Sequence, residues 1–275
     1  MPLFKKYRFI AARRIVQTSI IILFVGGSLY GWPALRGNLS SSRLFDAVSL
    51  TDPFAILQIL ASGKIVAEEA IIGALFVALF FGIVAGRSFC SWICPLNIIM
   101  DAANWLREKM GLDSQGRSFT LNRNSRYWAM GVSLAVSALT GIAAFEWISP
   151  VSMLHRGIIF GMGIGWTIVF SVFIFDLFLV KHGFCGHLCP LGAFYSLLTS
   201  FSLLRVRHSS GKCTLCMKCL RICPERQVLP MVGERSGAVL SGECTNCGRC
   251  IEVCDFDAMK FGVRFSVEKY KTGNA

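Results

Sequence analysis

The chain alternates between long apolar stretches and short polar connections. Four stretches approach the roughly 20 residues that a helix needs to cross a bilayer, and they cover about residues 14–33, 66–86, 127–148 and 158–180. A fifth apolar piece, residues 53–61, is too short to cross and is expected at the membrane interface. The pattern therefore predicts a mainly α-helical membrane domain with four spans within residues 1–204.

Basic residues divide the connections into two groups. The tail up to Arg14 holds five Lys and Arg residues, residues 87–126 hold six, and residues 181–275 hold thirteen. The other two connections share only Arg36, Arg43, Lys64 and Arg156. Because Lys and Arg accumulate on the cytoplasmic side of membrane proteins, both termini are predicted to be cytoplasmic.

Composition supports the membrane assignment. Apolar residues make up 54% of the chain, charged residues 16%, and the mean hydropathy is +0.57. The net charge of +12 lies largely in the segments predicted to be cytoplasmic. A membrane protein with basic inner loops accounts for that charge, so nucleic-acid binding is not indicated.

Eight of the twelve cysteines lie in two runs near the C-terminus. The runs read Cys213-x2-Cys216-x2-Cys219-x3-Cys223-Pro224 and Cys244-x2-Cys247-x2-Cys250-x3-Cys254. This is the spacing of bacterial ferredoxins, in which three thiolates of a run bind one [4Fe-4S] cluster and the fourth binds the other. Structural zinc also uses paired C-x2-C units, but it does not account for the third cysteine step.

The spacing assigns four ligands to each of two [4Fe-4S] clusters. The expected ligands of cluster 1 are Cys213, Cys216, Cys219 and Cys254, and those of cluster 2 are Cys244, Cys247, Cys250 and Cys223. Residues 205–275 are accordingly predicted to form a small α+β ferredoxin-like domain with a short tail. Free thiolates require a reducing compartment, which agrees with a cytoplasmic position.

The remaining four cysteines reveal a duplication. The pattern Phe-Cys-x3-Cys-Pro-Leu occurs at residues 89–96 and again at 184–191, 95 positions later. Each copy follows a span that returns to the cytoplasm and precedes an amphipathic stretch, so two units form a parallel repeat. Proline favours the first helical position and keeps the residue before it out of the helix. We therefore expect Cys94 and Cys189 to end the turns, with helices beginning at Pro95 and Pro190.

The two turns place four thiols at the inner membrane surface. If the turns face each other, Cys90, Cys94, Cys185 and Cys189 can bind a third metal centre or cluster, or cycle between dithiol and disulfide. Buried packing cysteines are the simpler alternative. His187 lies within the second turn, but its counterpart in the first turn is Trp92, so the repeat does not indicate a ligand role for it.

Taken together, the chain resembles the NapH-type membrane ferredoxins, the quinol dehydrogenase subunits of periplasmic nitrate reductase systems, within the wider NosR/CcoG-like polyferredoxin family. The resemblance rests on the four spans, the two Phe-Cys-x3-Cys-Pro-Leu turns and the two ferredoxin runs. It implies a redox subunit that takes electrons from menaquinol or ubiquinol. Those electrons would pass, with a periplasmic iron–sulfur partner, toward a nitrate reductase complex.

The resemblance also implies a location and leaves alternatives. It places the chain in the bacterial inner membrane as a multi-pass protein. A methylamine-utilisation homologue has a similar size, and a maturation factor for a copper or other metalloenzyme would use the cysteine turns to bind or reduce metal. A plain membrane anchor for a redox partner is a third reading. The second run ends Cys254-Asp255 rather than Cys-Pro, which affects only the local turn.

A quinol site needs an apolar pocket and groups that accept two protons. Four carboxylates in or beside the spans are candidates because charged residues there are functional by default. They are Glu68, Glu69, Glu146 and Asp176. For the three glutamates, a position among lipid headgroups is the simpler interpretation.

Overall fold

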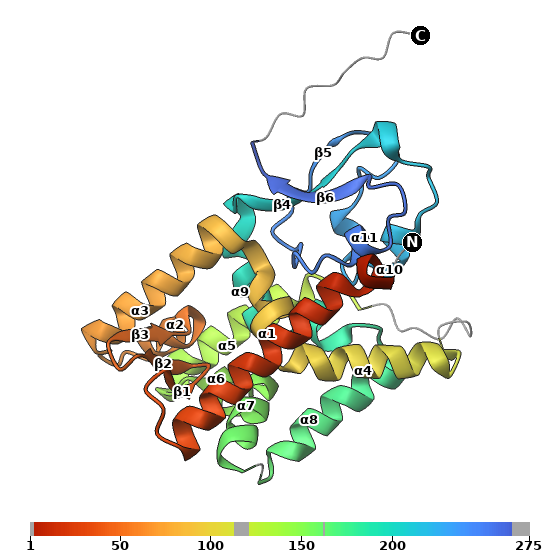
Figure 1. The fold of residues 1–275 in the computed structure, drawn as a ribbon. Coiled ribbons are helices and arrows are strands. Elements are labelled where there is room, and N and C mark those ends of the chain that lie inside the picture. Colours follow the sequence, from red (N-terminus) through yellow and green to blue (C-terminus); the bar gives the residue numbers. More distant parts are fainter. Residues whose placement is uncertain (1–2, 113–120, 162, 266–275) are drawn as a thin grey trace.

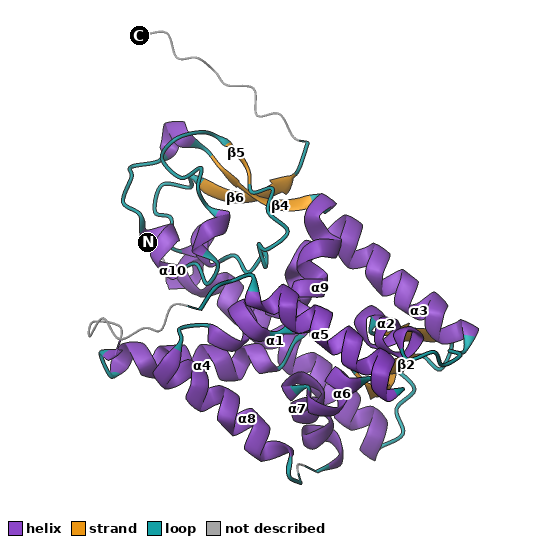
Figure 2. Ribbon diagram, turned by 180° about the vertical axis from the view of Figure 1, so that it is seen from behind, coloured by secondary structure: helices purple, strands orange, loops and turns teal. Residues whose placement is uncertain are grey.

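The computed structural model describes residues 3–112, 121–161 and 163–265. A large helical part, residues 3–203, supports a smaller cysteine-rich part, residues 204–265, at one end (Figure 1). The N-terminus lies beside the cysteine-rich part in both views (Figures 1 and 2). A mainly helical fold with a small α+β region carrying the cysteine runs is therefore confirmed.

The helical part contains α-helices, π-helical segments and one small sheet. The α-helices are α1 (Leu3–Leu29), α2 (Pro53–Ala61), α3 (Glu68–Leu79), α4 (Leu96–Lys109), α5 (Ser125–Thr140), α6 (Ala144–Ile148), α7 (Pro150–Phe160), α8 (Gly165–Ile174) and α9 (Pro190–Leu198). The π-helical segments are η1 (Phe80–Ala85), η3 (Phe89–Ile93), η5 (Phe175–Leu179) and η6 (Phe184–Leu188), and the 3₁₀ turns are η2 (Gly86–Ser88) and η7 (Thr199–Phe201).

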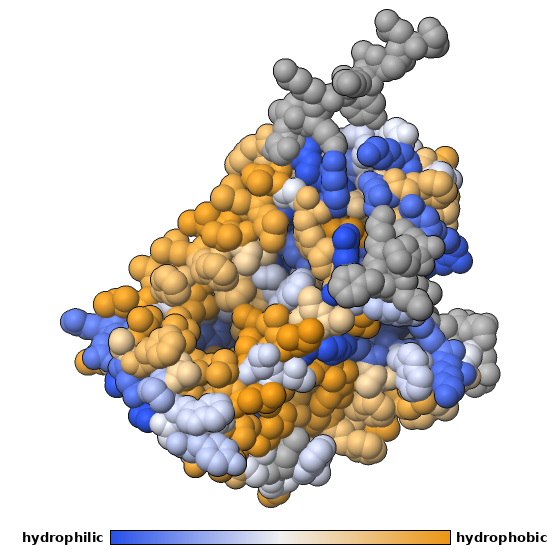
Figure 3. Space-filling view, in the orientation of Figure 1, coloured by the Kyte–Doolittle hydropathy of each residue, from blue (hydrophilic) through white to orange (hydrophobic). Residues whose placement is uncertain are grey.

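Two helices in the described residues are long and apolar enough to cross a membrane, Tyr7–Leu29 and Glu68–Ile93. They correspond to the first two predicted spans, and both extend further toward the side predicted to be cytoplasmic than the sequence pattern indicated. A shorter apolar helix covers Gly165–Leu179. Exposed apolar side chains form broad patches over the helical part (Figure 3).

The other two predicted spans are not continuous helices. Residues 127–148 are divided where Gly141 takes a left-handed conformation (φ 69°), which ends α5 before α6 begins. Residues 158–180 are divided where Gly161 (φ 99°) ends α7, and α8 begins at Gly165. Glycine adopts positive φ without a steric cost, so an apolar stretch can turn at such a position without losing hydrophobicity.

The short apolar piece at 53–61 forms helix α2, which packs in the core of the helical part, and its position at the membrane interface stays a prediction. Asp52 caps α2 by accepting a hydrogen bond from Phe54 N at 3.1 Å, and Pro53 occupies the first turn. Phe54 is fully buried and packs in one core with Leu96 and Tyr195. The helix is too short to span, but tertiary packing buries its apolar face within the helical part.

The connection after α1 folds into a sheet that the sequence reasoning did not anticipate. Strands β1 (Leu35–Asn38), β2 (Ser41–Leu44) and β3 (Val48–Thr51) pair antiparallel in that order. Asn38 accepts hydrogen bonds from Ser40 N and Ser41 N, which closes the tight turn between β1 and β2. The sheet packs against α1 and α3.

The cysteine-rich part has a three-stranded antiparallel sheet, in the order β5-β4-β6. Its elements are β4 (Leu204–His208), η8 (Ser210–Lys212), α10 (Lys218–Ile222), η9 (Arg226–Val228), β5 (Gly237–Ala238), α11 (Arg249–Glu252) and β6 (Met259–Val263). The amphipathic stretch predicted from Pro190 to Leu204 is shorter in the structure, because α9 ends at Leu198 and the chain enters β4. Most residues of α9 are buried.

Helix α1 joins the two parts. Its first turns pack on the cysteine-rich part, where Glu252 accepts hydrogen bonds from Phe9 N and Ile10 N. The Phe9 ring meets the Phe261 ring edge-on at 5.3 Å. The first predicted span is therefore the apolar portion of a longer helix whose basic beginning forms part of the contact between the two parts.

Candidate functional site

The two ferredoxin runs fold as equivalent loops, 31 residues apart. Leu215 (φ 57°) corresponds to Asn246 (φ 49°), and Met217 (φ 55°) corresponds to Gly248 (φ 77°). A short helix follows each loop, α10 after the first and α11 after the second. Left-handed residues alternating with ordinary ones curl a loop so that successive N–H groups point inward, a geometry common at iron–sulfur sites.

Two small cavities in the cysteine-rich part are each lined by four cysteines. One is lined by Cys213, Cys216, Cys219 and Cys254, together with apolar side chains that include Val232 and Met259. The other is lined by Cys223, Cys244, Cys247 and Cys250, together with Val206 and Leu229. Each run therefore sends its last cysteine to the cavity of the other run.

The donor set fits [4Fe-4S] clusters. All twelve cysteines are free thiols. Burial raises the pKa of Cys244 to about 11 and raises that of Cys250 well above its usual range, with neighbouring cysteines adding to both. Such thiols become thiolates only beside a positive charge, which an iron–sulfur core supplies. In the described residues, no group of three or more His, Cys, Asp or Glu is placed to hold a single metal ion.

The two cysteine turns are single π-helical turns at the same register. Cys94 N donates to Phe89 O at 3.0 Å, and Cys189 N donates to Phe184 O at 2.9 Å. Both cysteines then adopt extended backbone (ψ 118° and 111°), as the following prolines require. The prediction that Cys94 and Cys189 end their turns is confirmed. The thiol of Cys189 also caps α9 by accepting from Gly192 N at 3.4 Å.

The four turn cysteines share one apolar core. Cys94 and Cys189 are 6% and 5% exposed and belong to the same buried cluster, against which Cys90 and Cys185 pack. Phe54, from α2, lies in that cluster as well. The structure thus brings the two turns together in the interior. The duplicated sequence pattern allowed this arrangement but did not require it.

The first turn contacts the cluster 2 loop directly. Ser91 Oγ donates to Thr245 O at 2.7 Å, and Trp92 Nε1 donates to Asn246 O at 3.1 Å. In return, Asn246 Nδ2 donates to Ala85 O at 3.1 Å. Ser91 and Trp92 lie between the turn cysteines, and Thr245 and Asn246 lie between Cys244 and Cys247. The first cysteine turn and the second ferredoxin run are therefore hydrogen-bonded directly to each other.

A close backbone approach supports this contact. A Cβ atom at Gly86 would lie 2.9 Å from Asn246 Nδ2, and Gly86 itself has φ 65°. Any other residue would therefore strain the backbone here and displace the Asn246 side-chain amide that donates to Ala85 O.

The second turn reaches the cysteine-rich part through arginines. Arg87 donates to Cys185 O at 3.2 Å and pairs with Glu225 at 3.1 Å. Arg126 donates to Gly186 O at 3.5 Å and also pairs with Glu225. The carbonyl groups of this turn therefore point at buried guanidinium groups.

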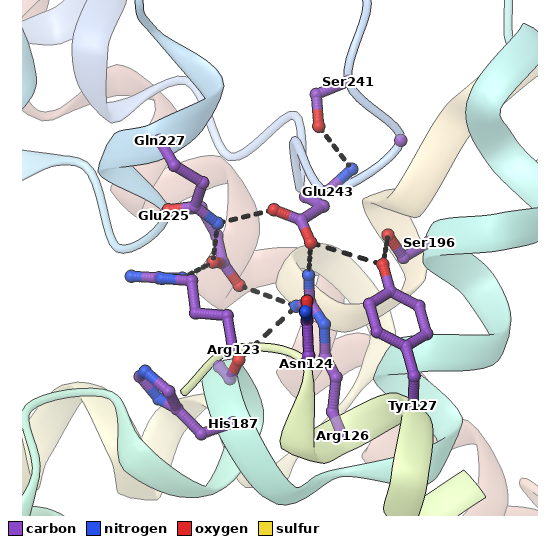
Figure 4. Close-up of polar contacts among 12 residues, drawn as sticks. Arg123, Asn124, Arg126, Tyr127, His187, Ser196, Glu225, Gln227, Ser241 and Glu243 are labelled. Atoms are coloured by element: carbon purple, nitrogen blue, oxygen red, sulfur yellow. Dashed lines mark hydrogen bonds and ion pairs between the residues drawn. The ribbon is translucent and has the colours of Figure 1, made fainter. Parts of the chain in front are cut away.

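We call this arrangement the arginine seam and define it by Arg87, Arg123, Arg126, Glu225 and Glu243. Arg123 pairs with Glu225, and Arg126 pairs with Glu243 (Figure 4). Glu225 follows the last cysteine of the first run by two residues, and Glu243 precedes the first cysteine of the second run. The seam therefore holds both ends of the connection between the two runs, next to Cys223 and Cys244 of cluster 2.

A second ionic contact is centred on a carboxylate of α4. Asp101 pairs with Arg14 of α1 and Arg249 of α11, and lies 3.9 Å from Arg13. Burial by itself raises the pKa of Asp101, but Arg249, Arg13 and Arg14 outweigh that effect and hold the pKa below its usual range. One carboxylate thus joins the N-terminal helix, the helix after the first turn and the cysteine-rich part.

The four carboxylates singled out in the sequence lie in different surroundings. Asp176 is fully buried and accepts from Phe184 N at 3.0 Å, which fixes the start of the second turn. Glu68 and Glu69 are exposed, and Glu69 pairs with Arg43. Glu146 accepts from Ser40 Oγ and pairs with Arg156 at 3.0 Å. The structure does not bring these groups to one place.

Sequence reasoning missed two features. One is the arginine seam, whose arginines it counted only as markers of orientation. The other is Asp52, which lines a cavity beside the first cysteine turn. An Asp-Pro pair directly before an apolar run is a signal for a capped helix, and it was present in the sequence.

Comparisons with known proteins agree with this picture. A family model described as a 4Fe-4S binding domain matches twice, at residues 67–113 and 160–208. The two matches contain the two cysteine turns, so the duplication is recovered independently. A second model, described as a 4Fe-4S dicluster domain, matches residues 205–255. The chain is therefore an iron–sulfur protein of the ferredoxin type.

Curated relatives narrow the family. "Methylamine utilization ferredoxin-type protein MauN" of Paracoccus denitrificans is 45% identical over 232 residues, which is 83% of this chain and 81% of the relative. "Ferredoxin-type protein NapH" of Escherichia coli is 43% identical over 235 residues, 84% and 81%. MauN of Methylorubrum extorquens is 41% identical over 239 residues, 86% and 82%. The chain belongs to the NapH/MauN family of ferredoxin-type proteins. No solved structure matches it.

Proposed function

We propose that the chain is a membrane-bound iron–sulfur subunit that takes electrons from quinol and relays them through two [4Fe-4S] clusters. The observation that carries the proposal is the direct contact between the first cysteine turn and the cluster 2 loop, through Ser91 and Trp92. This contact makes the apolar helices and the electron-carrying loops one continuous body. The whole is a redox subunit of a quinol dehydrogenase complex.

We assign the cluster ligands from the cysteines that line the two small cavities. Cluster 1 is assigned to Cys213, Cys216, Cys219 and Cys254, and cluster 2 to Cys244, Cys247, Cys250 and Cys223. Each bound cluster supplies one-electron transfer. The free thiols and the curled loops of both runs support this assignment.

The clusters differ in access. At equivalent loop positions Leu215 is 56% exposed, whereas Asn246 is 1% exposed and bonded to the helical part. Cys216 is exposed, and Cys244 and Cys250 are buried. In this proposal cluster 2 exchanges electrons with the membrane domain, and cluster 1 exchanges them with another protein.

The helical part is proposed to lie in the bacterial inner membrane, with both termini cytoplasmic. The support is the two spanning-length helices and the basic residues at their inner ends. The final acceptor is proposed to be a periplasmic nitrate reductase, reached with a partner iron–sulfur protein. Relatives named NapH and MauN are similarly close, so methylamine utilisation is the competing pathway.

Cys90, Cys94, Cys185 and Cys189 are proposed to hold a third metal centre of the iron–sulfur cluster type, since the described residues place no three such ligands to hold a single metal ion. Their shared core, and a 4Fe-4S binding model that matches both turns, support this assignment. In the predicted orientation the two ferredoxin clusters lie inside, whereas nitrate reduction is outside. A centre at the turns would stand between the clusters and the apolar helices, where electrons have to cross.

The proposal is tested on protein purified without oxygen. Full-length chain should contain about eight irons for two clusters, plus those of any third centre, and quinol should reduce the clusters as seen by EPR. If dithionite reduces the clusters but neither ubiquinol nor menaquinol does, with or without membrane partners, the proposal is wrong. A deletion strain that loses a copper enzyme but keeps quinol oxidation would instead support the maturation factor.

A further inference from the structure

A cavity of about 180 Å³ lies between α1, the sheet β1–β3, the second span and α9. We call it the α1–sheet cavity and define it by Phe24, Asp52, Phe81, Phe89 and Tyr195. Its other walls are largely aliphatic. An apolar protein cavity of about 150 Å³ is enough to bind benzene, so this one has room for a single aromatic ring.

The cavity opens to the surface of the helical part. The space-filling view shows this face hollowed between α1 and the sheet, with hydrophobic colours around the rim (Figure 3). Side chains exposed on the flanking helices include Ile22 and Phe76. In a membrane these side chains face lipid, so a ring can enter from the side while an isoprenoid tail stays among the lipid chains.

Two polar side chains of the cavity can meet the oxygens of a ring. Tyr195 is 1% exposed, its ring is stacked on Phe89 at 4.9 Å, and its hydroxyl has no hydrogen-bond partner within the described residues. A buried tyrosine hydroxyl usually has a partner. Asp52 uses its carboxylate to cap α2, and burial, with the charge of Glu146 adding to it, raises the pKa of Asp52 to about 7.

Polar residues join Asp52 to Arg156 at the surface. Its backbone N–H donates to Ser40 O at 3.0 Å, and Ser40 Oγ donates to Glu146. Glu146 in turn pairs with Arg156, which is half exposed. Asp52, Ser40 and Arg156 belong to the two connections predicted to lie outside the membrane, and Glu146 lies at the end of the third predicted span on that side, so a proton on Asp52 is close to the outer side.

The opposite wall of the cavity belongs to the electron-carrying side. Phe89 and Ile93 line the cavity and are part of the first cysteine turn. The same turn binds the cluster 2 loop through Ser91 and Trp92. The cavity is therefore lined both by a carboxylate that can accept protons and by the first cysteine turn, which is what oxidation of a quinol requires.

We propose that the α1–sheet cavity is the quinol site, with Asp52 as the proton acceptor and Tyr195 as the hydrogen-bond partner of a ring oxygen. This inference rests on the proposed function, which makes quinol the electron donor. One quinol loses two electrons and two protons and becomes quinone. The electrons go singly to the iron–sulfur centres, and Asp52 accepts the two protons one after the other and releases each to water on the outer side.

The test uses full-length protein with its clusters, in detergent, and short-chain ubiquinol and menaquinol as donors. Asp52→Asn and Tyr195→Phe should each slow quinol-driven cluster reduction by tenfold or more, while reduction by dithionite stays unchanged. Val77→Phe places a ring in the cavity wall and should abolish binding of the matching short-chain quinone, measured by calorimetry. Glu69→Gln changes an exposed carboxylate in the first turn of α3 that pairs with Arg43 and does not line the cavity, so it is the control and should behave as wild type.

The outcomes separate the two proposals. If wild type is not reduced by either quinol, the proposed function is wrong. If wild type is reduced and binds quinone, but Asp52→Asn, Tyr195→Phe and Val77→Phe all match it, the function stands and the cavity is not the site. Asp52→Glu keeps the carboxylate, so partial recovery of the rate with Asp52→Glu distinguishes a proton acceptor from a residue that only caps α2.

Discussion

The two cysteine turns have the same backbone and different neighbours. Both are π-helical turns closed by an extended cysteine, 95 residues apart. The first turn presents Ser91 and Trp92 to the cluster 2 loop, whereas the second has Gly186 and His187 at those positions and presents carbonyl groups to arginines. Duplication preserved the turn, and divergence of two side chains decided which turn contacts the cluster loop.

The helices that follow the turns differ in the same way. Asp101 in α4 binds arginines of α1 and α11. Its counterpart 95 positions later is Ser196 in α9, which contacts the Tyr127 hydroxyl at 3.1 Å. A charged contact on one side and a neutral one on the other mean that changes at equivalent positions should have unequal effects.

The largest effect is expected at the turn cysteines themselves. If the turns share one metal centre, Cys94→Ser and Cys189→Ser should each remove all metal beyond the two ferredoxin clusters, together with its EPR signal. Metal analysis and EPR on anaerobic protein measure this. Loss of the extra metal in only one of the two variants would show that the turns do not act as a pair.

The next largest effect is expected in the arginine seam. Glu225→Gln leaves three arginines without their shared carboxylate, and a buried charge without its partner costs about 3–5 kcal/mol. Thermal unfolding of the cluster-loaded protein should show this loss. Asp255→Asn removes the exposed pair with Lys218 and should leave the unfolding temperature nearly unchanged. Equal losses would mean that the seam contributes no more than a surface pair.

A smaller effect is expected at the first turn. Trp92→Phe keeps an aromatic ring but removes the hydrogen bond to Asn246 O, which should cost about 1 kcal/mol. Transfer of electrons to cluster 2 should slow as the loop loosens, which rapid-mixing EPR can follow. Trp105→Phe, on the exposed face of α4, is the matched control. Identical behaviour of both variants would argue against a role for the indole N–H.

The smallest effect is expected at Ser196. Ser196→Ala removes one neutral hydrogen bond with Tyr127, and the free energy of unfolding should fall by about 0.5–1 kcal/mol. Tyr127 keeps its contact with Glu243. Denaturant unfolding compares this variant with Asp101→Ala, which should lose several times more. A loss at Ser196 as large as that at Asp101 would contradict the proposed asymmetry.

Patterns of short range in the sequence predicted the cysteine motifs well. The extended backbone of Cys94 and Cys189 follows from the prolines after them, and each ferredoxin run is defined by its own spacing. Hydrophobicity also located two spanning-length helices. It did not place the breaks at Gly141 and Gly161, because glycine changes backbone direction without changing the apolar pattern.

Contacts between distant segments could not be predicted in this way. The burial of α2 against α9 depends on packing across about 140 residues of sequence, and Phe54 carries no local sign of it. In the sequence, Arg87 and Arg126 indicated only membrane orientation. In the structure they form ion pairs with Glu225 and Glu243. Which residue pairs with a charged side chain depends on the fold, whereas the number of charged residues can be read from the sequence.

The sequence by itself determined that this protein carries cysteine ligands for two clusters, a duplicated turn and a helical, apolar body. These properties depend on residue spacing and composition, which can be read directly from the sequence. Only the tertiary structure decided that the two turns meet in one core, that the first turn contacts the cluster 2 loop, and that Asp52 and Tyr195 share a cavity. Each of these results joins segments far apart in the chain, and packing alone brings such segments together.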